Sequence, residues 1–279
     1  LEHSIVHGIT HEEISLKFMN KLNGYFKGNL TLVIEIFAGI YHRKFFNQLI
    51  TSQLDIDRLD YLKRDSFYTG VAEGNISSDR LIAMMNVVDD ELVIEKKGIY
   101  SVEKFLIARR LMYWQVYLHK TGLSAEHMLV KLLTRAKALV QSGVEVKSSE
   151  ALQFFFQNRI NQNNFNNEVL DRFARLDDFD IMSAIKEWYT HTDIVLRSLA
   201  RMIVNRELLR IEIHDKKISE ELELNKAIDF MTATGLYKND VAYFVFKGEI
   251  SNQTYNKKEP IRILTEKGKL KDITKASDH

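Results

Sequence analysis

Apolar residues recur every three or four positions along most of the chain, the spacing of helices with one buried face. Ile14, Phe18 and Leu22 follow the run Thr10–Glu13, in which Thr10 as N-cap and Glu13 as the third helical residue form a capping box. Proline occurs once and glycine twelve times in 279 residues, so few residues interrupt helices. The pattern therefore predicts a mainly α-helical chain.

Further helices are predicted along the next two hundred residues. The expected segments are two buried helices within Leu30–Ile50 separated near Gly39, a charged helix from Gln53 to Phe67, a helix that Ser101 caps and that runs to about Lys120, a helix from Ser124, and three or four helices over 150–210.

Strand patterns are fewer, and most lie near the C-terminus. Leu92–Tyr100 predicts a hairpin that turns at Lys97-Gly98, and Val241–Phe246 and Ile261–Leu264 predict strands. We therefore expect two domains, a helical body over residues 1–210 and a small α/β region over 211–279.

Composition and charge narrow the function classes. The 39 basic and 38 acidic residues give a net charge of +1, so nothing indicates a nucleic-acid partner, and any anionic ligand needs a local cluster of cations. The absence of cysteine excludes disulfides and thiolate sites. No apolar run approaches the roughly 20 residues that span a bilayer. We expect a cytoplasmic protein without a membrane partner.

The densest polar pattern is Ser-Gln-Leu-Asp-Ile-Asp-Arg-Leu-Asp-Tyr-Leu-Lys-Arg-Asp, from Ser52 to Asp65. In a helix, Asp57, Tyr61 and Asp65 (the carboxylate row) are four residues apart and share one face. Carboxylates are hard ligands for metal ions, and the adjacent arginine suits phosphate oxygens. The row fits a phosphate-bearing ligand beside a metal, although charged faces of this spacing are more often simply solvated.

A second row lies on the helix predicted after Ser101. Arg109, Tyr113 and Tyr117 (the aromatic row) again recur every four residues. Arginine suits phosphate, and tyrosine suits the sugar edge and the base of a nucleotide. The common alternative is an amphipathic helix with half-buried tyrosines.

The run from Ser52 to Asp65 resembles the last metal-ligand motif of the HD-domain triphosphohydrolases, the family of bacterial deoxynucleotide triphosphohydrolases. The segments Ile9–Glu12, Ser66–Val71 and Arg109–Lys120 also match, and the resemblance spans at least residues 9–140. It implies a mainly α fold, an HD-domain helical bundle with a small C-terminal α/β region.

The resemblance also implies a metal centre. Asp57 matches one ligand of a single divalent ion, which could be Mg, Mn, Fe or Zn. His11, with Glu12 beside it, matches a catalytic histidine that transfers a proton near the reacting phosphate. The family's first histidine ligand and its His-Asp pair have no counterpart here. We therefore expect them upstream of Leu1, and we expect the isolated chain to be inactive.

Six substrate-binding residues follow from the resemblance: Arg58, Tyr61, Asp65, Arg109, Tyr113 and Tyr117. Asp65 matches a carboxylate at the 3′-hydroxyl of deoxyribose, and Tyr61 matches the tyrosine that leaves no room for a 2′-hydroxyl. Arg58 stands where some members have lysine, and Tyr113 stands where some have histidine.

The expected function is therefore metal-dependent hydrolysis of deoxynucleoside triphosphates (dNTPs) to deoxynucleoside and inorganic triphosphate. The family implies a homodimer or homotetramer and a nucleotide activator. Two other functions stay open: a regulatory nucleotide-binding subunit with an incomplete catalytic centre, and an HD phosphohydrolase acting on another nucleotide or phosphate ester.

Overall fold

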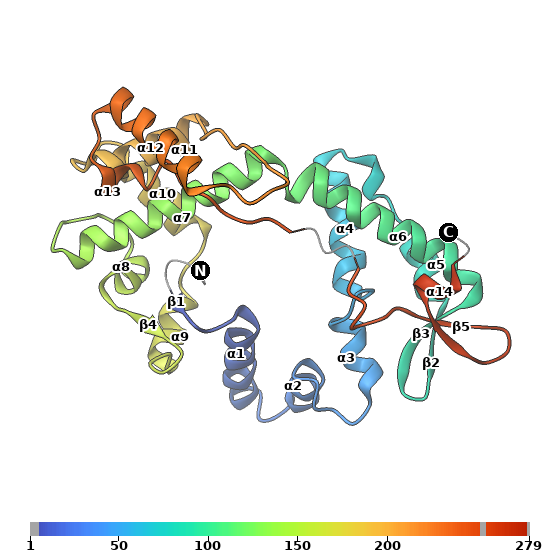
Figure 1. Cartoon of the computed structure of the whole chain (residues 1–279). Helices are drawn as coiled ribbons and strands as arrows, with labels where there is room; N and C mark the ends of the chain where they lie inside the picture. Colours follow the sequence, from blue (N-terminus) through green and yellow to red (C-terminus); the bar gives the residue numbers. More distant parts are fainter. Residues whose placement is uncertain (1–5, 252–254, 278–279) are drawn as a thin grey trace. The chain divides into compact units, whose positions relative to one another are not determined.

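The computed structural model describes residues 6–251 and 255–277. Helices dominate the fold (Figure 1), which confirms the predicted mainly α class. Two compact units share the chain: unit 1 holds the residues up to Lys17 with Lys120–Glu249, and unit 2 holds Phe18–His119 with the residues from Ile250 on. The expected domain boundary at residue 210 does not coincide with these limits. None of the described helices is long and apolar enough to cross a membrane.

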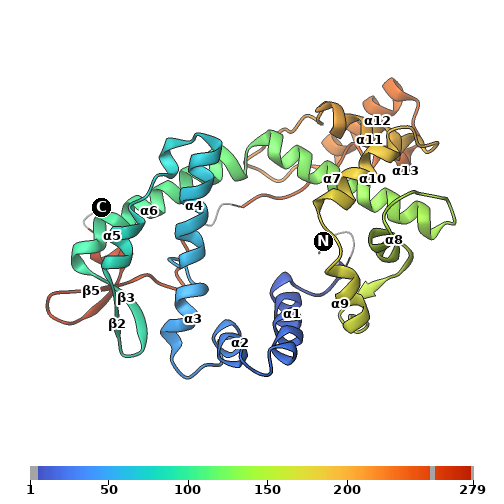
Figure 2. The same cartoon turned by 180° about the vertical axis from the view of Figure 1, so that it is seen from behind.

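Unit 2 combines helices with a four-stranded sheet, which Figure 2 shows from behind. Its elements are α2 (Thr31–Phe37), α3 (Lys44–Ile50), α4 (Ile56–Thr69), η1 (Ala72–Gly74), α5 (Ser78–Ala83), β2 (Met85–Val88), β3 (Glu91–Glu95), η2 (Lys96–Gly98), α6 (Ile99–Met112), the π-helical turn η3 (Tyr113–Tyr117), β5 (Arg262–Leu264), β6 (Leu270–Asp272) and α14 (Ile273–Ala276). The strand order is β2-β3-β5-β6, in which β3 and β5 are parallel and the outer pairs are antiparallel.

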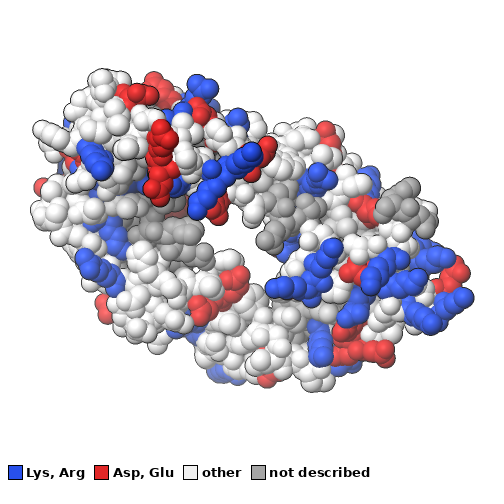
Figure 3. Space-filling model, in the orientation of Figure 1, with Lys and Arg blue, Asp and Glu red and all other residues white. Residues whose placement is uncertain are grey.

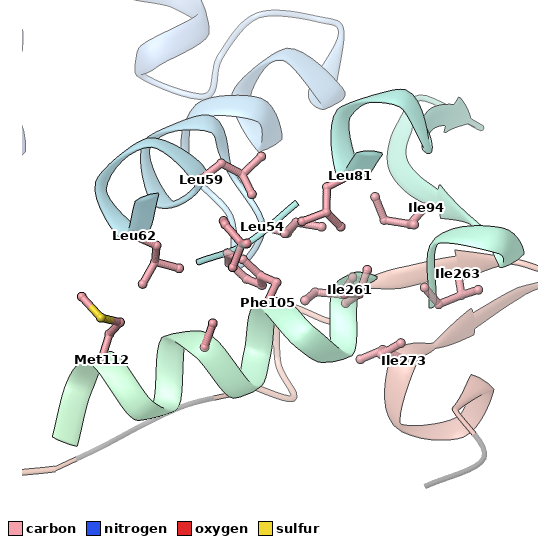
Figure 4. Close-up of a cluster of buried hydrophobic side chains, with 13 residues drawn as sticks. Leu54, Leu59, Leu62, Leu81, Ile94, Phe105, Met112, Ile261, Ile263 and Ile273 are labelled. Carbon is pink, nitrogen blue, oxygen red and sulfur yellow. The ribbon is translucent and has the colours of Figure 1, made fainter. Parts of the chain in front are cut away.

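One apolar cluster fixes the two helices that carry the polar rows (Figure 4). Leu59 and Leu62 come from α4, Phe105 and Met112 from α6, and Ile263 from β5, and none is more than 3% exposed. Burial of a side chain of this size contributes roughly 1.5–3 kcal/mol. The polar rows lie at the border of this cluster, where Tyr61 and Tyr117 pack against it and are only partly exposed.

Gly74 lies where this cluster leaves no room for a methyl group. A Cβ atom there would lie 2.6 Å from Met112 Sδ and 2.7 Å from Ser66 Cβ. We expect Gly74→Ala to lower the free energy of urea unfolding by about 1–3 kcal/mol because of this overpacking. Gly24→Ala is the matched control: Gly24 lies in α1 (His11–Tyr25) with no atom within 4 Å of its Cβ position, so alanine should stabilise. A stabilised Gly74 variant would contradict the packing argument.

Unit 1 is a helical assembly with one short parallel strand pair, β1 with β4. Its elements beyond the start of α1 are β1 (Val6–His7), α7 (Lys120–Gln141), α8 (Glu150–Gln157), β4 (Ile160–Asn161), α9 (Asn167–Phe173), α10 (Asp178–Trp188), α11 (Ile194–Asn205), α12 (Glu220–Thr234) and α13 (Lys238–Val241). The capping box that opens α1 is confirmed: Thr10 N donates to Glu13 Oε2 at 2.8 Å, and Glu13 N donates to Thr10 Oγ1 at 3.3 Å.

A half-buried ion pair joins α7 to the start of α11. Arg135 donates from Nε and Nη2 to the two oxygens of Asp193, at 3.1 and 2.6 Å, and Asp193 also caps α11 by accepting from Leu196 N at 2.8 Å. Burial opposes ionisation, but the hydrogen bonds from Arg135 and Leu196 N hold the pKa of Asp193 below its usual value. The charged form is therefore the one that stabilises the fold.

The Asp193 pair should stabilise the protein only while the carboxylate is ionised. We expect Asp193→Asn to cost about 1–3 kcal/mol of unfolding free energy at pH 7. Because the folded pKa is lowered, the contribution is complete above the unfolded pKa of about 3.9 and is lost as the pH falls through the folded value. Urea unfolding between pH 7 and pH 3 measures this. Asp177→Asn is the control, because Asp177 caps α10 through backbone amides, a task that asparagine performs equally well. Equal losses in both variants would refute a special role for the pair.

Four local predictions are wrong. The first concerns the hairpin at Leu92–Tyr100: β2 and β3 turn instead at Asp89 and Asp90, both with positive φ, 51° and 63°. Aspartate tolerates this conformation. Gly98 lies at the end of η2 instead, where an added Cβ would be only 2.6 Å from Ile94 Cγ2.

The second is the strand at Val241–Phe246. This segment is the end of α13 followed by turns. Val241 and Phe244, three residues apart, are buried, and the Phe244 ring stacks on Phe230 of α12 at 5.4 Å. The apolar run packs with helical spacing rather than alternating as in a strand.

The third and fourth concern helix burial and helix ends. Helices do occur within Leu30–Ile50, but none of the residues of α2 and α3, all of them described, is buried. The helix expected from Ser101 to Lys120 begins at Ile99 and changes to a π-helical turn after Met112, and the next one begins at Lys120 rather than Ser124.

Candidate functional site

The carboxylate row lies on helix α4, whose two ends are fixed by caps and whose apolar face, Leu59 and Leu62, packs in the cluster. Buried Asp55 is the N-cap: its carboxylate accepts from Arg58 N at 2.7 Å and from Ser52 N at 3.1 Å. Gly70, with a φ of 72°, ends the helix. Between these ends, Asp57 is exposed, while Tyr61 and Asp65 are half-buried.

The aromatic row begins on α6 and continues through the π-helical turn η3. Arg109 is 6% exposed, whereas Tyr113 and Tyr117 are half-buried. Leu118 N donates to Tyr113 O at 2.7 Å, the wider spacing that defines a π turn. Single π turns of this kind are frequent at functional sites.

The two rows meet. Tyr117 Oη donates to Asp65 Oδ2 at 2.6 Å, which joins α6 and its extension to α4. The Tyr117 ring lies edge-on to Tyr61 at 6.0 Å and to Tyr113 at 5.2 Å. Four of the six predicted substrate residues therefore form one connected group.

Burial raises the pKa of two phenols of this group, Tyr61 and Tyr117, above the ordinary value. Burial and the nearby Tyr113 raise the pKa of Tyr61, although Arg109 and Arg58 act to lower it. Burial and the hydrogen bond to Asp65 raise the pKa of Tyr117. Both hydroxyls can donate hydrogen bonds at neutral pH, and Asp65 accepts the one from Tyr117.

A cavity of about 330 Å³ lies at the arginine end of the rows. Its lining residues are Gln53, Arg58, Arg109, Tyr113, Ser251, Asn256 and Glu259. The Arg58 Nε donates to Ser52 O at 2.7 Å and to Asp55 at 3.1 Å, which fixes its stem beside the cavity. The Arg109 guanidinium lies 5.7 Å from the Tyr113 ring centre. Two guanidinium groups at one cavity suit an anion such as a phosphate chain.

Cations also gather elsewhere on unit 2. Figure 3 shows Lys and Arg side chains clustered over the part of the unit that carries the small sheet. A chain with a net charge of only +1 thus concentrates positive charge locally, as an anionic ligand requires.

Four cavity-lining residues, Gln53, Ser251, Asn256 and Glu259, were not among the predicted substrate residues. Gln53 belongs to the run that carries the resemblance, so its position in that run could have marked it. Asn256 and Glu259 are some two hundred positions later in the sequence, and no local pattern connects them to α4.

Asp57 does not line the cavity, and its carboxylate is exposed. Within 6–251 and 255–277, no three His, Cys, Asp or Glu side chains are grouped as metal ligands. One carboxylate does not hold a divalent ion, which takes four or more ligands in known protein sites. The described residues therefore do not by themselves fit a metal centre.

His11 and Glu12 lie in unit 1, at the start of α1. Their side chains are 3.1 Å apart, from His11 Nε2 to Glu12 Oε1, and both are well exposed. The four residues of the joined rows and the arginine cavity all lie in unit 2. The catalytic role of His11 and Glu12 stays a prediction.

Comparison with known proteins defines the class. Residues 76–152 match the model of the HD associated region. A crystal structure of a phosphohydrolase from Bacteroides thetaiotaomicron is 47% identical, with a TM-score of 0.95, and the match covers all of this chain and 70% of that one. The helical fold and this relative place the chain in a family of phosphohydrolases. More particularly, the chain belongs to the HD-domain phosphohydrolases.

Two curated relatives extend the comparison. The uncharacterized protein YwfO of Bacillus subtilis is 32% identical over 260 residues, which are 88% of this chain and 56% of YwfO. The chain thus spans little more than half the length of that relative. The deoxynucleoside triphosphate triphosphohydrolase SAMHD1 homolog of Dictyostelium discoideum is 28% identical over 138 residues, 45% of this chain and 27% of that protein.

Proposed function

We propose that the whole protein, in the cytoplasm, hydrolyses dNTPs to deoxynucleoside and inorganic triphosphate. The observation that carries this is the hydrogen bond from Tyr117 to Asp65, which joins the two rows next to the cavity of Arg58 and Arg109. Phenols and a carboxylate suit a sugar and base, and the guanidinium groups suit phosphates. The name of the Dictyostelium relative supports the same substrate class.

Each residue has a task in this proposal. Arg58 and Arg109 offset charge on the phosphate chain as it develops in the transition state. Asp65 accepts the 3′-hydroxyl of the sugar, and Tyr61 packs against the ring where a 2′-hydroxyl would stand. Tyr113 and Tyr117 border the sugar and the base.

Asp57, His11 and Glu12 complete the proposal for the whole protein. We propose Asp57 as one ligand of a divalent ion (Mg, Mn, Fe or Zn), with the other ligands outside the described residues. His11, oriented by Glu12, would exchange a proton with the attacking water or the leaving oxygen, because an imidazole titrates near neutral pH. A homodimer or homotetramer with a nucleotide activator belongs to the same proposal.

The test incubates the whole protein with dGTP and Mn²⁺ and separates the products by chromatography. Deoxyguanosine and triphosphate are expected, whereas deoxyguanosine monophosphate with pyrophosphate would refute the reaction. Parallel incubations with GTP and a cyclic dinucleotide identify an HD phosphohydrolase of another specificity. Binding of dGTP without any hydrolysis would instead indicate the regulatory subunit.

A further inference from the structure

Gln53 joins two segments that are 203 positions apart in the sequence. Its side chain is buried, at 5% exposure, two residues before the N-cap of α4, Asp55. Its Oε1 accepts from Asn256 N at 2.5 Å, and its Nε2 donates to Asn256 O at 2.7 Å and also to Glu259 O. The side-chain amide of Gln53 thus pairs with the backbone of Asn256 and Glu259 as a neighbouring strand would.

The segment that Gln53 holds is residues 255–261, here called the strap. Its far end is fixed independently: Ile261 is in the apolar cluster, and Ile261 N donates to Tyr255 Oη at 3.1 Å. Tyr255 Oη in turn donates to Asp272 at 2.9 Å, and burial together with this bond raises the pKa of Tyr255 to about 12. Gln53 is the contact that places the middle of the strap against α4.

The same Gln53 lines the cavity of Arg58 and Arg109, together with Asn256 and Glu259 of the strap. In Asn256, the side-chain oxygen accepts from Lys258 N at 3.0 Å, so Nδ2 is the donor that the side chain offers to a ligand. The strap therefore adds an amide, from Asn256, and a carboxylate, from Glu259, to a cavity that also holds the two cations Arg58 and Arg109.

We propose that Gln53 is a positioning residue that holds the strap against the cavity of Arg58 and Arg109, and that Asn256 donates to phosphate oxygens bound there. This rests on the proposed function, because it assigns the arginine cavity to the triphosphate end of the substrate. The proposal gives Asn256, which lies about two hundred positions after the run Ser52–Asp65, a part in binding.

The test measures the Kd of the whole protein for inorganic triphosphate by titration calorimetry, without added metal. Gln53→Met keeps the side-chain length and removes the amide, so the Kd should rise about tenfold or more, the loss of roughly one hydrogen bond in a preorganised site. Hydrogen exchange in residues 255–261 should accelerate in the same variant.

Gln48→Met is the matched control. Gln48 also anchors a backbone amide, since its Oε1 accepts from Leu92 N at 2.7 Å, but it does not line the arginine cavity. Its replacement should leave the Kd for triphosphate within about twofold, within the ordinary scatter of surface changes. An equal rise in both variants would show that Gln53 acts only through general stability.

Asn256→Asp tests the strap without touching Gln53. Aspartate keeps the acceptor for Lys258 N, and it places a negative charge beside the bound anion, so the Kd should rise about tenfold or more. Asn86→Asp, at an exposed position of β2, changes the net charge equally and should leave the Kd unchanged.

The outcomes separate the two proposals. If Arg109→Ala weakens triphosphate binding and neither Gln53→Met nor Asn256→Asp does, the strap proposal is overturned and the proposed function stands. If triphosphate does not bind the native protein, or if Arg109→Ala binds it as tightly as the native protein does, the cavity does not hold phosphate. Both proposals are then refuted.

Discussion

Arg109→Ala is expected to lower kcat/KM for dNTP hydrolysis by about 100- to 1,000-fold, the usual loss when one preorganised donor to transition-state charge is removed. Arg109 is 6% exposed and lines the cavity with Arg58, so its guanidinium acts on an anion in a partly dehydrated site. Steady-state kinetics on the whole protein, with circular dichroism to check the fold, measure the loss.

Two companion variants sharpen this test. Arg110, the next residue of α6, is exposed and does not line the cavity, so Arg110→Ala should leave kcat/KM nearly unchanged. Arg109→Lys keeps the charge but loses the planar pair of donors, so it should recover only part of the activity. Wild-type kinetics in the folded Arg109→Ala variant would rule out the phosphate role.

Phe105→Ala is expected to cost about 3–5 kcal/mol of local stability, the range for removing a fully buried aromatic side chain. Phe105 is 0% exposed in the cluster between α4, α6 and β5. Native-state hydrogen exchange of the α4 and α6 amides should accelerate by two to four orders of magnitude, since each 1.4 kcal/mol is about tenfold.

Ile107→Ala is the control on the same helix. Ile107 is 59% exposed, so its loss should change exchange only slightly, by about 0.5 kcal/mol or less. If both variants exchanged alike, the apolar cluster would not be what holds the two polar rows in register. Dependence of the site on this packing also predicts that Phe105→Ala reduces dNTP binding.

What the sequence could predict was local. The capping box of Thr10 and Glu13 and the carboxylate row of α4 follow from spacing within a few residues, and the structure has both. The aromatic row is also present, although no signal in the local sequence predicted the π turn at Tyr113.

What it could not predict depends on partners far along the chain. The parallel pairing of Ile94 with Ile263 and the bond from Gln53 to Asn256 have no local pattern. The expected strand at Val241–Phe246 failed for the same reason, since packing on Phe230 decided its conformation. The roles of the site residues are equally non-local, and they stay predictions that kinetics must decide.

Unit 2 is made of two stretches of the chain that unit 1 separates, and this delays its folding during translation. Its sheet needs β5 and β6, which leave the ribosome only after all of unit 1 has been made. Unit 2 therefore cannot complete its fold while its own first hundred residues are translated, and the edge of β3 stays unpaired until β5 (Arg262–Leu264) has been made. A stop codon just before Ile261 would leave that edge permanently unpaired, so such a fragment should aggregate even though the six substrate-binding positions are all intact in its sequence.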